Sequence, residues 1–177
     1  SFNRDIGSWD VSKVTKMSSM FEMAETFNQP LDKWNVSKVT HMGSLFGSAL
    51  NFNQDISNWD VSNVIYMSGM FSNTVFNKNI SKWDVSNVLY MNHMFYDASV
   101  FNQDISNWDV SSVTTMKYMF LEALAFNTDI SNWDVSNVND MTFMFGSASS
   151  FNVDISDWDV SNVTNMRNMF SDALAFN

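Results

Sequence analysis

Large apolar residues return along the chain with a fixed period. Both recurrent series advance by 25 residues, except for one step of 24. Tryptophan lies at 9, 34, 59, 83, 108, 133 and 158, and the pair Phe-Asn begins at 2, 27, 52, 76, 101, 126, 151 and 176. A period of roughly 20–50 residues is typical of solenoids, propellers and arrays. The pattern therefore predicts one repeat domain over residues 1–177, with units starting near 2, 27, 52, 76, 101, 126 and 151.

A second period lies inside each unit. In the third unit Val64, Met67, Phe71 and Thr74 are spaced i, i+3, i+7 and i+10, which places them on one face of a helix. Ser62 comes just before this segment, where its hydroxyl can accept a hydrogen bond from a free N–H of the first turn. We therefore predict a short helix in every unit.

The residues before the predicted helix indicate a corner and a strand. Trp59 and Val61 are expected to point inward, while Asp60 suits an Asx turn that closes the backbone between them. The segment around Ile56 predicts a short parallel strand. The fold class expected from the sequence is thus an α/β repeat of about seven coils, each with a short strand, a Trp/Asp/Ser corner and a short helix.

A single unit is too small to fold alone. Burial of one large side chain contributes roughly 1.5–3 kcal/mol, against about 1–2 kcal/mol of backbone entropy for each ordered residue. Stacked units share their apolar faces, so stability should grow with the number of units. The chain begins with SFN and ends with AFN, without a polar capping segment at either end. We expect either flanking repeats in a longer protein or end-to-end self-association.

Composition and charge exclude several classes of partner and site. The chain has no cysteine, so it has no disulfide framework and no thiolate metal site. Its formal net charge of −10 argues against nucleic acid and anionic membrane surfaces, because phosphate binding needs basic patches. No apolar run reaches the roughly 18–20 residues that span a bilayer, which predicts no direct membrane insertion. No catalytic residues and no cofactor are expected.

Asparagine and aspartate recur at fixed positions of the unit. The Asn that follows Phe can form a ladder of hydrogen bonds along the stack, because its amide both donates and accepts. This ladder would comprise Asn28, Asn53, Asn77, Asn102, Asn127 and Asn152. Two columns of Asp could make turns or bind calcium. Asn35 and Asn79 replace Asp in these columns, which favours turns, and we predict no metal site.

The outward positions of the predicted helices carry most of the variation between units. Aromatic side chains in these positions form an oblique stripe across the third to sixth units. The stripe consists of Tyr66, Tyr90, His93, Tyr118 and Phe143. A contiguous aromatic patch often marks a recognition surface, although these rings could also fill gaps between neighbouring helices. We take them as the candidate binding residues.

The repeat resembles a known family. The segments FNQDISNWDVSNVIYMSGMF at 52–71 and FNQDISNWDVSSVTTMKYMF at 101–120 are similar to the mycoplasma-type lipoprotein repeat of BspA-like leucine-rich-repeat surface proteins. The resemblance extends over essentially the whole chain. It implies a leucine-rich-repeat-like, right-handed solenoid, a secreted or cell-surface location, and a role in adhesion or partner binding.

These observations favour a non-catalytic extracellular or cell-surface solenoid that binds a protein or a glycan on another surface through its side. The alternative is a structural subunit or spacer of a surface filament or appendage that assembles end to end. An enzyme remains an option only if the catalytic residues lie in a domain outside this chain.

Overall fold

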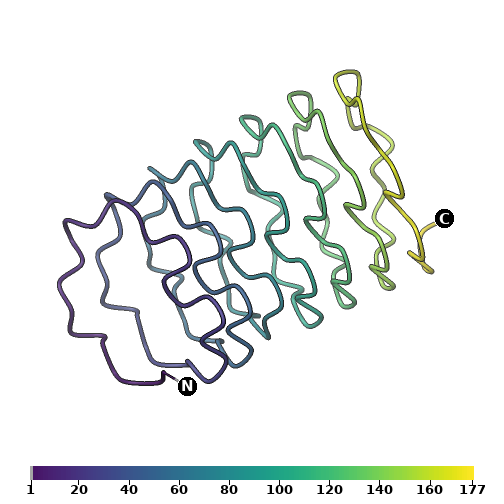
Figure 1. The fold of residues 1–177 in the computed structure, drawn as a ribbon. Coiled ribbons are helices and arrows are strands. Elements are labelled where there is room, and N and C mark those ends of the chain that lie inside the picture. The colour runs from purple at the N-terminus through teal and green to yellow at the C-terminus, as the bar shows by residue number, and fades with distance from the viewer. Residues whose placement is uncertain (1) are drawn as a thin grey trace.

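The computed structural model describes residues 2–177, which wind through a stack of coils with the two termini at opposite ends (Figure 1). We number the coils 1 to 7 by the units 2–26, 27–51, 52–75, 76–100, 101–125, 126–150 and 151–175. Residues 2–177 contain no α-helix and no extended strand. Isolated parallel bridges join one position of each coil to the next, in the order Lys16, His41, Tyr66, Tyr90, Thr115, Asp140 and Asn165.

The predicted α/β repeat is therefore wrong, and turns take the place of the helix. In coil 3 the backbone adopts positive φ at Gly69, 66°, and again four residues later at Asn73, 54°. Alternate N–H groups donate to carbonyls of coil 4 instead of bonding within a helix. These bonds run from Met67, Gly69, Phe71 and Asn73 to Tyr90, Asn92, Met94 and Tyr96, with N–O distances of 2.6–3.0 Å.

The spacing of the aromatic rings explains why no helix forms. The Phe71 ring stacks on Phe46 and Phe95 of the adjacent coils, with centroid distances of 5.9 and 5.8 Å. Packed helices lie about 8–10 Å apart, so helices in successive coils would pull these rings out of contact. A helix of two or three turns is also marginal on its own. Hydrogen bonds and stacked rings between coils therefore replace those within a helix.

The predicted strand and helix cap are also absent. The segment around Ile56 carries no strand among the described residues. The hydroxyl of Ser62 donates to Oδ1 of Asp60 at 2.6 Å, and its backbone N–H donates to the same oxygen at 3.1 Å. Ser62 thus closes an Asx turn. The neighbouring Trp59 and Val61 are buried, so this part of the unit does form a corner.

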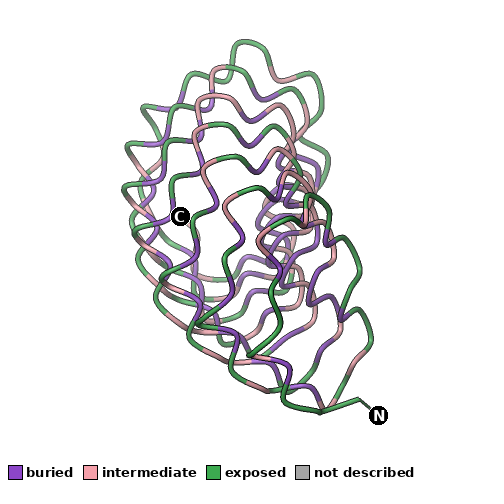
Figure 2. Ribbon diagram, turned by 90° about the vertical axis from the view of Figure 1, so that its left-hand side faces the viewer, coloured by how far each residue is buried: buried purple, intermediate pink, exposed green. Residues whose placement is uncertain are grey.

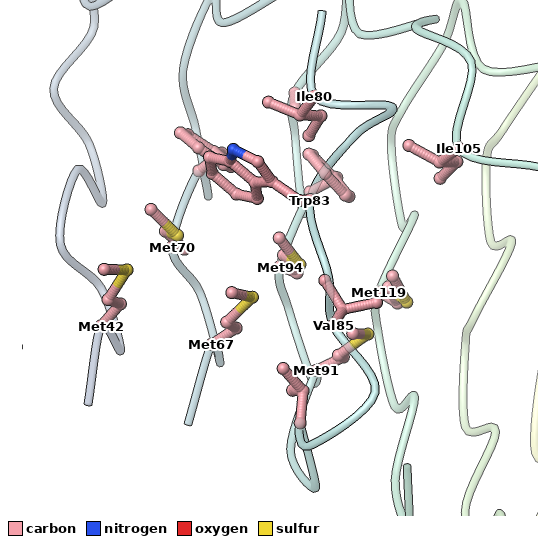
Figure 3. Packing of buried hydrophobic residues seen from close by; sticks show 14 of the residues in the cluster. Met42, Met67, Met70, Ile80, Trp83, Val85, Met91, Met94, Ile105 and Met119 are labelled. Carbon is pink, nitrogen blue, oxygen red and sulfur yellow. The ribbon is translucent and has the colours of Figure 1, made fainter. Parts of the chain in front are cut away.

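The core runs along the axis of the stack, and buried and exposed positions alternate along each coil (Figure 2). Phenylalanine, tryptophan and methionine at equivalent positions fill it, and Figure 3 shows several of these methionines beside Trp83. Each indole from coil 2 onward also bonds to the preceding coil. The Nε1–H of Trp108, for example, donates to the carbonyl oxygen of Ile80 at 3.1 Å. A column of identical residues therefore supplies both packing and hydrogen bonds between coils.

The one 24-residue coil is closed by a side chain. In coil 5 the N–H of Ala123 donates to the Phe120 carbonyl, and the Phe126 N–H donates to the Ala123 carbonyl, both at 3.1 Å. Coil 3 has Thr74 at the alanine position. The Thr74 hydroxyl donates to the Phe71 carbonyl at 2.8 Å and accepts from the Phe76 N–H at 3.4 Å. In the short coil, the Thr74 side-chain oxygen thus makes the two contacts that the backbone of Ala123 makes in coil 5.

The first and last coils have one face without a neighbouring coil. Trp9 is 54% exposed, although its counterparts in coils 2 to 7 are buried, and Met166 is 42% exposed. A further coil placed on either face would cover these side chains. Within residues 2–177 no helix is suited to cross a bilayer.

Candidate binding surface

The repeated turns display side chains on one side of the stack, which we call the turn face. It consists of the segments 16–23, 41–48, 66–73, 90–97, 115–122, 140–147 and 165–172. Two positions of each segment are at least partly exposed, apart from Gly69: the bridge position, and the position three residues later, where φ is positive. Because the coils stack in register, equivalent side chains of successive coils lie beside one another. Aromatic residues at these positions can therefore stack.

The first aromatic column lies at the bridge position of coils 2 to 4. The His41 and Tyr66 rings stack with a centroid distance of 4.4 Å, and the Tyr66 and Tyr90 rings with 4.8 Å. Tyr66 is 37% exposed, and the other two rings are half-buried. Nδ1 of His41 also lies 2.8 Å from the Thr40 hydroxyl. Ring edges and phenol hydroxyls thus face solvent in a fixed arrangement.

The second aromatic column lies three residues further along coils 4 to 6. The His93 ring contacts Tyr118 at a centroid distance of 4.7 Å, and Tyr118 stacks on Phe143 at 5.5 Å. The Lys117 Nζ lies 5.1 Å from the centre of the Tyr118 ring. Burial, and then the charge of Lys117, lower the pKa of His93 below its usual value. The neutral imidazole is therefore the form that stacks at neutral pH.

All five predicted aromatic residues lie on the turn face, but in two offset columns instead of one stripe. Tyr66 and Tyr90 belong to the first column, and His93, Tyr118 and Phe143 to the second. His41 was not among the predicted residues, although it extends the first column. Its alignment with Tyr66 in the repeat was the available signal.

Asparagine side chains connect the coils on another side of the stack. Oδ1 of each Asn accepts the backbone N–H of the equivalent Asn in the next coil at 2.8–3.2 Å. The series runs through Asn3, Asn28, Asn53, Asn77, Asn102, Asn127, Asn152 and Asn177. Asn77 also accepts a bond from the Gln103 side chain at 2.9 Å. The amide oxygens of this series therefore hold successive coils in register.

The aspartate columns make turns. In coil 5 the hydroxyl and N–H of Ser106 both donate to Oδ1 of Asp104, at 2.7 and 3.0 Å. These two bonds lower the pKa of Asp104 below its ordinary 3.8. The carboxylate therefore stabilises the turn above that pH, and this contribution is lost as the pH falls through the lowered native pKa. Oδ1 of Asn35 accepts the same two bonds from the hydroxyl and N–H of Ser37, at 2.7 and 3.1 Å, so this turn geometry does not require charge.

No group of three or more His, Asp or Glu side chains within residues 2–177 is placed to hold a metal ion. We predict that calcium does not stabilise the protein. After treatment with a chelator, millimolar calcium should leave the melting temperature unchanged in differential scanning calorimetry. A rise of several degrees would indicate binding to the native state and would make the aspartate columns ligands.

Comparison with known proteins places the chain in a family. No curated protein and no solved structure matched it. A family model described as mycoplasma protein of unknown function, DUF285, matches residues 1–78 and 72–177. The matches carry no leucine-rich-repeat assignment. They cover the full length of the repeat array, and the chain therefore belongs to this mycoplasma protein family.

Proposed function

We propose that this chain is a non-catalytic binding module, secreted or held at the cell surface, whose turn face contacts a protein or glycan on another surface. The observation that carries the proposal is the pair of aromatic columns, in which partly exposed rings stack at 4.4–5.5 Å. The surface location and the link to BspA-like adhesins rest on the resemblance of the repeat sequence.

The columns suit binding for an energetic reason. Aromatic side chains provide large contact areas, and a protein normally loses entropy when it orders them at an interface. Here each ring is already restrained by its neighbour in the next coil, so less freedom remains to be lost. Lys117, above Tyr118, adds a positive charge to the same area. The rings thus form a preorganised surface that can contact either apolar or polar groups.

The test replaces tyrosines by serine and leaves the core intact. The triple variant Tyr66→Ser, Tyr90→Ser, Tyr118→Ser should lose at least about tenfold in affinity for whichever extracellular-matrix protein or glycan binds the wild type on an array. The melting temperature should change little, because these rings lie outside the core. Unchanged affinity of the triple variant would refute the proposal.

A matched control removes the same number of exposed apolar residues from positions outside the segments of the turn face. Val75, Val100 and Leu124 are 42, 43 and 46% exposed, and their replacement by serine should leave binding unchanged. If this control loses as much affinity as the tyrosine variant, the effect is not specific to the turn face.

End-to-end assembly is the second candidate. The last coil presents N–H groups that have no partner among residues 2–177, and the first coil presents carbonyls that also lack one. The donors are on Met166, Asn168, Phe170 and Asp172, and the acceptors on Lys16, Ser18, Met20 and Glu22. However, Phe176 already stacks on Phe151 of coil 7, and the Asn177 N–H already donates to Oδ1 of Asn152. A second copy would place its Phe2 and Asn3 at these same positions.

We rank assembly second because of this overlap. Static light scattering across a range of protein concentrations decides between the two candidates. The binding-module proposal predicts a constant molar mass of one chain. Growth into long species as the concentration rises would support the filament instead.

A further inference from the structure

A hollow of about 330 Å³ opens on the turn face beside the second aromatic column. Serine and glycine of coils 2 and 3 form its floor, among them Ser44 and Gly69. His93 and Tyr96 of coil 4 line one side, and Glu22 of coil 1 lines the other. Its volume falls at the small end of the range of about 300–1,000 Å³ for ligand pockets.

The hollow exists because two columns of the repeat lose their large side chains in coils 2 and 3. The position of His93, Tyr118 and Phe143 is occupied there by Ser44 and Gly69. The position of Tyr96 is occupied by glycine and serine, Gly47 and Ser72. One side of the His93 ring packs against Tyr118, with the two ring planes tilted by 33°. Gly69 has no side chain with which to cover the other face.

Polar groups without internal partners complete the site. The hydroxyls of Ser44 and Ser72 line the hollow, and neither makes a hydrogen bond with another part of the chain that the structure describes. Each can donate one hydrogen bond and accept others. The Glu22 carboxylate adds an acceptor at the far end. The site therefore combines an aromatic face with a floor and rim of hydrogen-bonding groups.

We propose that this hollow binds one neutral pyranose unit of a glycan. A pyranose has a face of C–H groups that can lie on the negative face of an aromatic ring, and a rim of hydroxyls that both donate and accept. Bound in coil 3 next to His93, it would continue the aromatic column where Gly69 interrupts it. The proposal rests on the proposed function and names the ligand class of the same face.

Two features favour a neutral sugar over other occupants. The aromatic side chain of a protein partner would cover the serine hydroxyls without bonding to them, which is unfavourable for buried polar groups. An acidic sugar would meet the Glu22 carboxylate and a chain of net charge −10. A neutral pyranose avoids both costs.

Filling the hollow with a ring tests the proposal. Gly69→Tyr should continue the column and occupy the sugar position. The fold should accept it, because Tyr118 occupies the same column with φ of 59°, close to the 66° of Gly69. A Cβ at position 69 would lie 3.2 Å from Oγ of Ser44, a hydroxyl that can rotate away. Asn168→Tyr is the matched control, because it adds a ring at the equivalent position of coil 7, away from the hollow.

The probes are soluble oligosaccharides of glucose, galactose, mannose or N-acetylglucosamine, titrated into labelled full-length chain and followed by two-dimensional NMR. We expect at least one to bind the wild type at millimolar concentration or below, with shifts at Ser44, Ser72 and His93. Gly69→Tyr should weaken this binding at least tenfold, while Asn168→Tyr should bind as the wild type does. The melting temperature of each variant verifies that it is folded.

The failures of the two proposals can be told apart. If no oligosaccharide binds, or Gly69→Tyr binds as tightly as the wild type, the sugar site is refuted. Loss of array binding in the triple tyrosine variant would then still support the turn face as a binding surface. An aromatic peptide that binds in the hollow when the oligosaccharides do not would assign it to a protein partner and also overturn the proposal.

Discussion

Replacement of Trp108 by alanine is expected to lower the free energy of unfolding by about 3–5 kcal/mol, as truncation of buried aromatic residues does. Trp108 is only 3% exposed, and its indole N–H donates to the Ile80 carbonyl at 3.1 Å. The variant loses the packing of the ring and the indole bond to the Ile80 carbonyl, which then keeps only its bond from the Trp83 N–H at 3.1 Å. For a chain of this length the melting temperature should fall by roughly 6–20 °C.

Trp9→Ala is the matched control, because it removes the same residue from the same position of coil 1. Trp9 is 54% exposed and makes no indole hydrogen bond within residues 2–177. The expected loss is about 1 kcal/mol or less, as for most exposed substitutions. Thermal and urea unfolding of both variants measures the difference. If Trp108→Ala shifts the melting temperature by no more than Trp9→Ala, the tryptophan column does not hold the coils together.

The periodicity of the sequence was sufficient to predict which residues form the core. Residues at equivalent positions of successive units must lie beside one another in any stacked repeat. The burial of Trp59 and Val61 at the corner follows from that register. The 25-residue period therefore determined the neighbours of each side chain without knowledge of the backbone conformation.

The local backbone could not be predicted from apolar spacing alone. A spacing of three and four residues fits an α-helix, but it also fits a chain that adopts positive φ at every fourth residue. The residues with positive φ include several serines, asparagines and aspartates, such as Ser44, Asn73 and Asp97, which favour turns. The recurrence of Phe at the same position of every unit was a second signal against helices. Rings that stack between adjacent coils must lie closer together than the axes of packed helices do.

The binding surface could be predicted in composition but not in arrangement. Alignment of the units identified Tyr66, Tyr90 and Tyr118 as outward and variable. Whether such rings stack depends on the distance between coils, and packed helices would hold them about 8–10 Å apart. His41 was not among the predicted binding residues, so its place beside Tyr66 was missed. The hollow could not be foreseen, because it arises where Gly69 lacks a side chain next to rings that the structure brings together.

The single short coil provides the second large effect. Thr74→Val should lower the free energy of unfolding by about 1–3 kcal/mol, because the buried Phe71 carbonyl and Phe76 N–H would lose their hydroxyl partner. Valine keeps the size and branching of threonine, so packing should change little. Thr74→Ser is the control: it keeps the hydroxyl and should cost less than valine. Chemical denaturation of the two variants provides the comparison.

A transplant of this turn into another coil tests the same explanation in the opposite direction. Ala occupies the equivalent position in the six coils of full length, and Thr occurs there only in the short one. Deletion of Leu124 shortens coil 5 in the same way and should destabilise it, because Ala123 has no hydroxyl to bond to Phe120 and Phe126. Adding Ala123→Thr to the deletion should recover a substantial part of the loss. If the added threonine brings no recovery, the hydroxyl does not compensate for the missing residue, and the short coil is stabilised in another way.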